Sequence, residues 1–169
     1  MTRPQLVRDL MTVGVPTCAA STPVSDVARL LLDLDLEAVA VLDREGHAAG
    51  VISQYELVQV YTRDGWQSLT AEQVMREDVP QIPPEIPLTA AIQIMQDQGV
   101  RVLFLMHHSD GISYPAAVIT YRHVLRLLAA RDQTELKDLG IHAAREAPLD
   151  TFIKRRDAAR QRAIRPPEE

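Results

Sequence analysis

The sequence predicts an α/β (α+β) fold made of two pseudo-symmetric β-α-β-β-α repeats, followed by a helical C-terminal extension. The main observation is that the chain contains two similar stretches of sequence. Met75 of the second stretch follows Met11 of the first by 64 residues, and other matching residues keep this spacing over most of the unit. Thr120 follows Ser53 by 67 residues, which indicates a three-residue insertion in the second copy. Two units this small are expected to fold against each other, because neither buries its apolar face alone. We therefore expect two matching clefts between the copies.

Each repeat alternates helical and extended patterns in the same order. A helix with one apolar face is expected after Thr22-Pro23, where Thr can cap the helix and Pro suits its first turn. The uninterrupted apolar run 38–42 is typical of a buried strand, and the chain returns as a second strand over 48–52. A further helix is then expected over 53–60.

The repeat also sets the organisation of the chain. We assign residues 4–65 to the first repeat, residues 68–131 to the second, and residues 132–169 to a helical C-terminal extension with a frayed end. Within the extension, Pro148 is expected to begin a last helix that runs to about Ile164, since Pro is favoured in the first helical turn.

Composition and charge narrow the class of protein. With 46% hydrophobic residues the chain can bury a core, and no apolar run is long enough to span a bilayer. The N-terminus lacks a signal pattern, so we expect a cytoplasmic protein without membrane association. Cys18 is the only cysteine, which excludes an internal disulfide and a cysteine-based metal cluster. The net charge is −5, with +5 over residues 154–165 and −8 over residues 1–153. An acidic body is a poor general surface for nucleic acid.

Several motifs follow one another in a fixed order. They are V-x-D-x-M (7–11), P-V-S-D-V-A (23–28), A-V-A-V-L-D (38–43) and G-V-I-S-x-x-E-L (50–57). This order, found twice at one spacing, resembles the CBS domain, the regulatory module first described in cystathionine beta-synthase. Over roughly residues 4–131 the chain is similar to a tandem CBS pair, or Bateman module, of the stand-alone kind. The resemblance implies that the two repeats pack through their sheets and that two such pairs form a homodimer.

The resemblance also implies ligand clefts between the repeats that often hold adenine nucleotides. In the family motif G-h-h-[ST]-x-x-[DN], the acidic side chain binds the ribose hydroxyls, and the Ser or Thr lies near the ribose or phosphate. The matching pairs here are Ser53 with Glu56 and Thr120 with His123. The candidates for the apolar wall near the base are Val15, Pro16, Val79, Pro80 and Ile82.

Physical chemistry gives reasons for this arrangement and a competing interpretation of it. A hydroxyl at a strand-to-helix junction can bind an oxygen, while the free N–H groups of the helix favour an anion. A carboxylate three residues later can accept two hydrogen bonds from a vicinal diol, and Glu56 is long enough to do so. His123 cannot replace a carboxylate simply, because a neutral imidazole offers one acceptor and a cation offers none. The competing interpretation of Ser53-x-x-Glu56 is a capping box, which satisfies the N–H groups of its own helix.

The second repeat offers a different chemistry. Arg122 and His123 could hold phosphate or another anion, with Arg101 or Arg126 assisting. The alternative is that Arg122 and Arg126, four residues apart, form a pair on a solvated helix face.

No catalytic triad, glycine-rich phosphate loop or metal-ligand set is evident in the sequence. His107 and His108 are expected in a turn after a strand. Adjacent residues of a strand point to opposite faces, so the two are not expected to share a metal ion. We therefore predict a non-enzymatic regulatory or sensor module that requires no cofactor. It would bind AMP, ADP, ATP or another adenosine derivative between its repeats and modulate a protein partner. One alternative is a ligand-free dimerisation module that engages a partner through the helix 148–165. A third alternative is that the basic tail makes a weak contact with an anion or with nucleic acid. We do not expect nucleic acid to be the partner.

Overall fold

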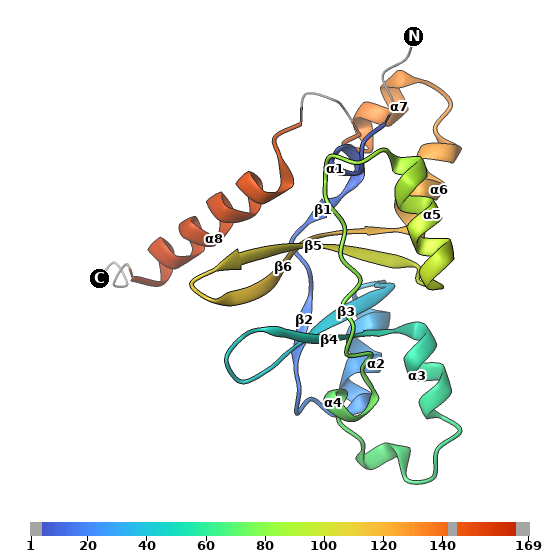
Figure 1. The fold of residues 1–169 in the computed structure, drawn as a ribbon, viewed down its shortest axis with the longest axis vertical. Coiled ribbons are helices and arrows are strands. Elements are labelled where there is room, and N and C mark those ends of the chain that lie inside the picture. The colour runs from blue at the N-terminus through green and yellow to red at the C-terminus, as the bar shows by residue number, and fades with distance from the viewer. Residues whose placement is uncertain (1–4, 142–144, 165–169) are drawn as a thin grey trace.

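A computed structural model describes residues 5–141 and 145–164 and shows two small sheets with helices packed around them (Figure 1). The first sheet has the strand order β2-β3-β4 and the second has the order β1-β6-β5. The strands are β1 (Thr12–Val13), β2 (Thr17–Ala19), β3 (Ala38–Leu42), β4 (Ala48–Ser53), β5 (Val102–Ser109) and β6 (Ile112–Thr120). The helices are α1 (Val7–Leu10), α2 (Val24–Asp33), α3 (Gln54–Val60), α4 (Ala71–Val74), α5 (Leu88–Gln98), α6 (Tyr121–Ala129), α7 (Gln133–Asp138) and α8 (Pro148–Ile164), with a short 3₁₀ turn η1 (Trp66–Ser68).

The pairing of the backbone repeats with the spacing of the sequence. Each sheet contains an antiparallel hairpin, β3-β4 or β5-β6, with a parallel partner beside its first strand and an antiparallel partner beside its second. Every pairing outside the hairpins has a counterpart in the other repeat. The equivalent pairs are Thr12–Val118 with Arg76–Val51, Thr17–Ala40 with Gln81–Phe104, and Leu6–Pro87 with Thr70–Pro23. The predicted duplication is therefore present in the backbone as well as in the sequence.

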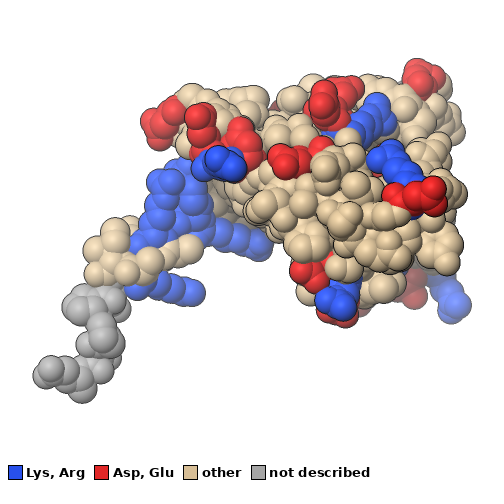
Figure 2. Space-filling view, turned by 90° about the horizontal axis from the view of Figure 1, so that it is seen from below, with Lys and Arg blue, Asp and Glu red and all other residues tan. Residues whose placement is uncertain are grey.

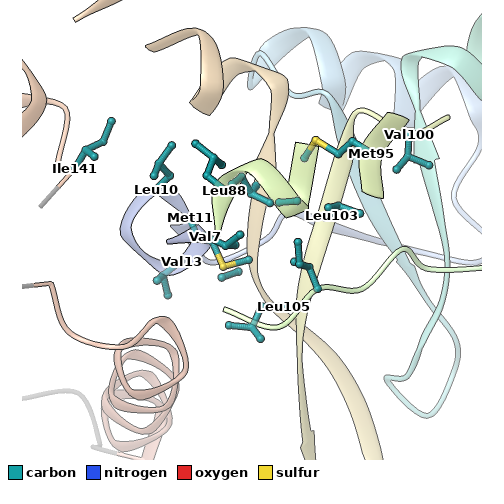
Figure 3. Close-up of a cluster of buried hydrophobic side chains, with 14 residues drawn as sticks. Val7, Leu10, Met11, Val13, Leu88, Met95, Val100, Leu103, Leu105 and Ile141 are labelled. Carbon is teal, nitrogen blue, oxygen red and sulfur yellow. The ribbon is translucent and has the colours of Figure 1, made fainter. Parts of the chain in front are cut away.

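The short leading helix of each repeat packs against the other repeat. Side chains of α1 and β1 lie in a cluster with α5, β5 and β6, including Met11, which is fully buried (Figure 3). In the same way, Ala71 and Val74 of α4 pack with Val27 of α2 and with the first sheet. A helix of four residues is too short to be stable by itself, so each gains its stability from this tertiary packing. The two repeats are therefore interlocked, and neither completes its core without a segment from the other.

A third cluster lies between the two sheets. Its buried members are Ala38 and Val51 from the first sheet, Val102, Phe104 and Met106 from the second, and Val79 from the loop before α5. This arrangement confirms that the two repeats pack through their sheets. The uninterrupted apolar pattern of β3 and β5 follows from it, because both faces of these strands are covered.

The C-terminal extension packs on the second repeat. Ile141 belongs to the core of that repeat, and Leu136, Leu149 and Phe152 pack against it. The Phe152 ring stacks on Tyr114 of β6 at a centroid distance of 5.8 Å and an interplanar angle of 26°. The predicted helix from Pro148 to Ile164 is present as α8, which contacts β1 and β6 and runs toward the same side of the molecule as the tip of the β5–β6 hairpin (Figure 1). Its cations gather on one side of the molecule, on the arm that leads to the C-terminus (Figure 2).

The start of α2 differs from the prediction. Thr22 does not cap this helix, since Pro23 precedes the first helical residue and no side-chain cap is formed. The Thr22 carbonyl instead accepts a hydrogen bond from the Ala71 N–H at 2.8 Å, and the Val24 N–H donates to the Leu69 carbonyl at 3.0 Å. The backbone groups at the start of α2 therefore bind the segment around α4, the leading helix of the second repeat. A rule that considers only capping within one helix does not anticipate such long-range hydrogen bonds.

The leading segment of the first repeat packs in the core of the second repeat, and Met11 belongs to this segment. A smaller side chain at residue 11 should therefore destabilise the second repeat. We expect Met11→Ala to lower the free energy of unfolding by about 2–5 kcal/mol, because it leaves a cavity among α5, β5 and β6. The measurement is urea unfolding followed by circular dichroism. Leu32→Ala, at an α2 side chain that is 80% exposed, serves as the control and should change stability by less than about 0.5 kcal/mol. Equal stability of Met11→Ala and the control would contradict the interlocked core.

Candidate functional site

Two clefts lie between the repeats, at equivalent places in the pseudo-symmetric fold. The first cleft, of about 450 Å³, includes Ser53 and Glu56 from the first repeat and Pro80 from the second. The second cleft, of about 410 Å³, includes Thr120 and His123 from the second repeat, and its walls from the first repeat include Val15, Pro16 and Asp35. Each cleft thus takes its strand-to-helix junction from one repeat and its opposite wall from the other.

In the first cleft, Ser53 and Glu56 form the capping box that their spacing allows. The Tyr55 N–H donates to Ser53 Oγ at 3.2 Å, and the Ser53 N–H donates to Glu56 Oε2 at 2.8 Å. The Ser53 hydroxyl also donates to Oε2. Among the described residues no donor reaches the other carboxylate oxygen, Oε1. Capping therefore does not exclude ligand binding, because Oε1 keeps two lone pairs that can accept hydrogen bonds from a diol.

Two arginines and a second carboxylate, Glu37, line the same cleft. Arg76 is held by its backbone, which exchanges two hydrogen bonds of 2.9 Å with Val51 of β4. Gly50 permits this close approach, because a Cβ atom there would lie 2.6 Å from the Arg76 carbonyl oxygen. Arg101 lies just before β5 and also lines this cleft, whereas Arg126, the other residue predicted to assist Arg122, lines the second cleft. The sequence analysis missed Arg76, and the repeat offers no signal for it because its counterpart is Thr12.

In the second cleft, His123 occupies the place of Glu56 and caps its own helix. The Thr120 N–H donates to His123 Nδ1 at 3.0 Å, which leaves the ring proton on Nε2. Nε2 lies 2.8 Å from Thr12 Oγ1 and donates to it. Both ring nitrogens are therefore engaged within the protein, and the imidazole offers no acceptor to a ribose diol.

The environment keeps this imidazole neutral. Burial is the main cause that lowers the pKa of His123 from its usual 6.5 to about 4, and nearby Arg126, Arg145 and Arg122 add to the effect. The hydrogen bond that the Thr120 N–H donates to Nδ1 also favours the neutral ring, because a protonated Nδ1 could not accept it. At neutral pH the side chain is therefore a neutral cap and not an anion-binding cation.

Arg122 forms an ion pair across the second cleft with Asp35, which follows α2 of the first repeat. Its Nη2 donates to Asp35 Oδ1 at 3.0 Å, and Nη1 contacts Oδ2. This hydrogen bond and the guanidinium charge lower the pKa of the Asp35 carboxyl. Arg122 and Arg126 are both exposed on α6, as the solvated-face alternative predicts, and Arg122 in addition pairs with Asp35 of the first repeat. Asp35 has a φ of +51°, and its equivalent in the second repeat is Gly99 with a φ of +64°.

The remaining predicted wall residues are divided between clefts and core. Val15 and Pro16 line the second cleft, and Pro80 lines the first. Val79 is buried between the sheets and Ile82 is buried in the core of the second repeat, so the structure gives both a packing role. The apolar loop of each repeat thus faces the strand-to-helix junction of the other.

The described residues hold no group of three or more His, Cys, Asp or Glu side chains that could bind a metal ion. His107 and His108 lie within β5 and not in a turn, which corrects the prediction. The His107 ring packs against Phe152 of α8, and its Nε2 lies 3.2 Å from Nη1 of Arg156. Burial raises the pKa of the Cys18 thiol, which disfavours the reactive thiolate. In the part of the chain that the structure describes, none of the helices has the length and apolar character needed to cross a membrane.

Comparison with known proteins agrees with this geometry. Residues 7–63 and 71–130 each match the family model of the CBS domain. The solved CBS domain pair of protein MJ0100, in complex with 5′-methylthioadenosine and S-adenosyl-L-methionine, is 15% identical with a TM-score of 0.65, over 77% of this chain and 100% of that chain. The CBS-domain protein ATU1752 from Agrobacterium tumefaciens is 19% identical with a TM-score of 0.64, over 73% and 93%. The CBS domain protein TA0289 from Thermoplasma acidophilum is 15% identical with a TM-score of 0.63, over 81% and 75%. No curated protein sequence matches the chain.

The environment of His123 predicts a specific loss of stability in acid. A group whose pKa is lower in the folded protein stabilises it fully above the unfolded value, and this stability is lost as the pH falls through the folded value. For His123 the window is from 6.5 down to about 4, and the loss amounts to at most about 3 kcal/mol. Urea unfolding at a series of pH values measures it.

The matched variant is His123→Gln, whose side-chain oxygen can still accept from the Thr120 N–H. We expect this variant to lose less stability than the unmodified protein between pH 6.5 and 4, since it lacks the titrating imidazole. Identical pH dependence in the two proteins would contradict the buried, neutral state of His123.

Proposed function

The chain belongs to the CBS-domain family, carrying two copies of the domain, and we propose that it is a non-enzymatic regulatory module that binds an adenine nucleotide in its first cleft. The observation that supports this best is the first cleft itself, where Oε1 of Glu56 has no donor among the described residues and two arginines line the same space. A CBS pair is a regulatory module, and a solved relative in fold was crystallised with two adenosine derivatives.

The parts of an adenine nucleotide correspond to different walls of this cleft. Glu56 would accept hydrogen bonds from the ribose hydroxyls, which are charge-assisted contacts. Pro80 and Val102 provide apolar surface for the base, and Arg76 and Arg101 would hold the phosphates. A cleft of about 450 Å³ is within the range of small-molecule sites in proteins.

Regulation would follow from the fact that the ligand touches both repeats. Ser53 and Glu56 come from the first repeat, whereas Pro80 and Arg101 come from the second. A ligand that contacts both favours the relative orientation in which its contacts are best and shifts the population toward it. Glu37 and Val102 line both clefts, so the two sites are neighbours in the fold.

The test is calorimetric titration with adenosine, AMP, ADP, ATP, S-adenosylmethionine and NADH. We expect Glu56→Gln to weaken nucleotide binding by about 10- to 100-fold, because Gln can keep the capping box but replaces the charged acceptor. Arg76→Gln should weaken ATP binding more than adenosine binding. His123→Gln, in the second cleft, is the control and should leave the affinity unchanged. Tight binding that survives both Glu56→Gln and Ser53→Ala would remove the first cleft as the site.

The second cleft supports another candidate function, that of an interaction module whose pockets hold no ligand. Its diol acceptor is absent, and the Arg122–Asp35 ion pair crosses it, so the protein itself supplies the link between the repeats. The basic helix α8 would then contact the partner. Mass spectrometry of the purified protein distinguishes the two candidates, because a co-purified small molecule would argue against the ligand-free module.

We also propose that the module forms a homodimer through α3 and α6. Val58 of α3 and Tyr61, which directly follows α3, are 72% and 76% exposed, and their equivalents in α6, Leu125 and Leu128, are 62% and 76% exposed. Both helices lie on the same side of the molecule, away from α8 (Figure 1). Large apolar side chains exposed at equivalent positions of both repeats suit a twofold interface, in which one surface meets itself.

This interface can be tested by sedimentation velocity. We expect the unmodified chain to sediment as a dimer and Leu128→Glu to sediment as a monomer, because the new carboxylate would be buried without a partner. Ile164→Glu, at a side chain of α8 that is 80% exposed, is the control and should remain dimeric. A monomeric unmodified chain, or a dimer in both variants, would contradict this interface.

A further inference from the structure

A separate pocket lies outside the two clefts, between the second repeat and the C-terminal extension. Its volume is about 310 Å³. Residues 10–13 and α6 form its walls on the side of the repeat, and residues 139–141, Arg145 and Arg155 form them on the side of the extension. Figure 1 shows α1, α6 and α7 together at one end of the molecule, close to where α8 begins. We call it the arginine pocket.

Three arginines line this pocket, Arg126, Arg145 and Arg155. Among the described residues, none of the three has a carboxylate within 4.0 Å, and none of the residues that line the pocket is acidic. Some other cations of the chain are paired with carboxylates, such as Arg122 with Asp35 and Lys154 with Glu146. The pocket therefore concentrates positive charge in a protein whose net charge is −5.

The cations are held in place by contacts that do not neutralise them. Nη1 of Arg155 donates to the Val13 carbonyl at 3.2 Å, and Nη2 of Arg8 donates to the Arg145 carbonyl at 3.4 Å. The carboxylate whose charge acts on Arg145 is that of Asp9, which already accepts hydrogen bonds from the Leu6 N–H and the Gln5 side chain. Burial, and then the charge of Arg155, lower the pKa of Arg145, as expected for a cation without a close counter-ion.

We propose that the arginine pocket binds a multiply charged oxyanion, namely phosphate or pyrophosphate, either free or as the phosphoryl group of a small metabolite. Guanidinium groups donate paired N–H groups that match the oxygens of phosphate, and three arginines line this one concave space. A bound anion would contact α6, α8 and Arg145, and so fasten the extension to the second repeat.

The pocket also borders the second cleft. Thr12, His123 and Arg126 line both spaces, and the hydrogen bond between Thr12 and His123 lies in the wall that they share. An anion in the pocket would therefore act on the side chain that caps α6. This site is independent of nucleotide binding in the first cleft, with which it shares none of its lining residues.

The direct experiment is calorimetric titration of the full chain with sodium pyrophosphate, and with sodium phosphate. We expect saturable binding of one pyrophosphate per chain, weakened at least tenfold in Arg145→Gln and in Arg155→Gln and partly restored in Arg145→Lys. Arg162→Gln is the matched control, since it removes one cation from the exposed end of α8 outside the pocket. Thermal melting of each variant verifies that it is folded, and Arg155→Gln serves as the test if Arg145→Gln unfolds.

The source of the phosphoryl group is distinguished by adding ADP and adenosine to the same series. Tighter binding of ADP than of pyrophosphate, lost in Arg145→Gln, would identify a nucleotide as the source, whereas adenosine should be insensitive to this variant. Pyrophosphate should also shift the NMR signals of the His123 ring more than those of His108. Absence of saturable binding, or an equal effect of Arg162→Gln, would overturn the proposal. Loss of pyrophosphate binding in Glu56→Gln but not in Arg145→Gln would overturn it while leaving the first cleft as the nucleotide site.

Discussion

Neither repeat completes its hydrophobic core alone, and the rest of the structure depends on this constraint. One side of each sheet is covered by helices of its own repeat and by the leading helix of the other, and the opposite side is buried against the second sheet. The segments that follow the exchanged helices carry Arg76 and Pro80 into the first cleft, and Thr12 and Pro16 into the second. The clefts are therefore a consequence of how the cores are closed.

The same backbone gives two clefts with different chemistry, because equivalent positions carry different side chains. Glu56 is replaced by His123, so a carboxylate with one oxygen available becomes a neutral imidazole with both nitrogens engaged. Gly99 is replaced by Asp35, which keeps the left-handed backbone but adds a carboxylate that binds Arg122. The first cleft thus leaves a carboxylate oxygen open to a ligand, whereas in the second cleft the capping imidazole and the Arg122–Asp35 pair are engaged within the protein.

The C-terminal extension adds a third level of asymmetry, since Ile141, Leu149 and Phe152 pack on the core of the second repeat. Its cations therefore lie near one cleft only. Arg145 of the extension, together with Arg126 and Arg122 of α6, lowers the pKa of His123 further. The protonation of this capping residue therefore depends on the position of the extension. The extension is in this way connected to the cleft chemistry of the second repeat, while the first cleft lies outside its reach.

The sequence by itself determined the duplication, the order of helices and strands, and the Ser53–Glu56 capping box, because these depend on equal spacing or on contacts within one helical turn. Only the tertiary structure decided which repeat each leading helix packs against, that Arg76 and Arg101 share a cleft, and that Arg122 meets Asp35. These contacts join residues far apart in the chain, and no local pattern encodes them. Burial and long-range charge set the state of His123 for the same reason, since both arise only when the two repeats and the extension are packed together.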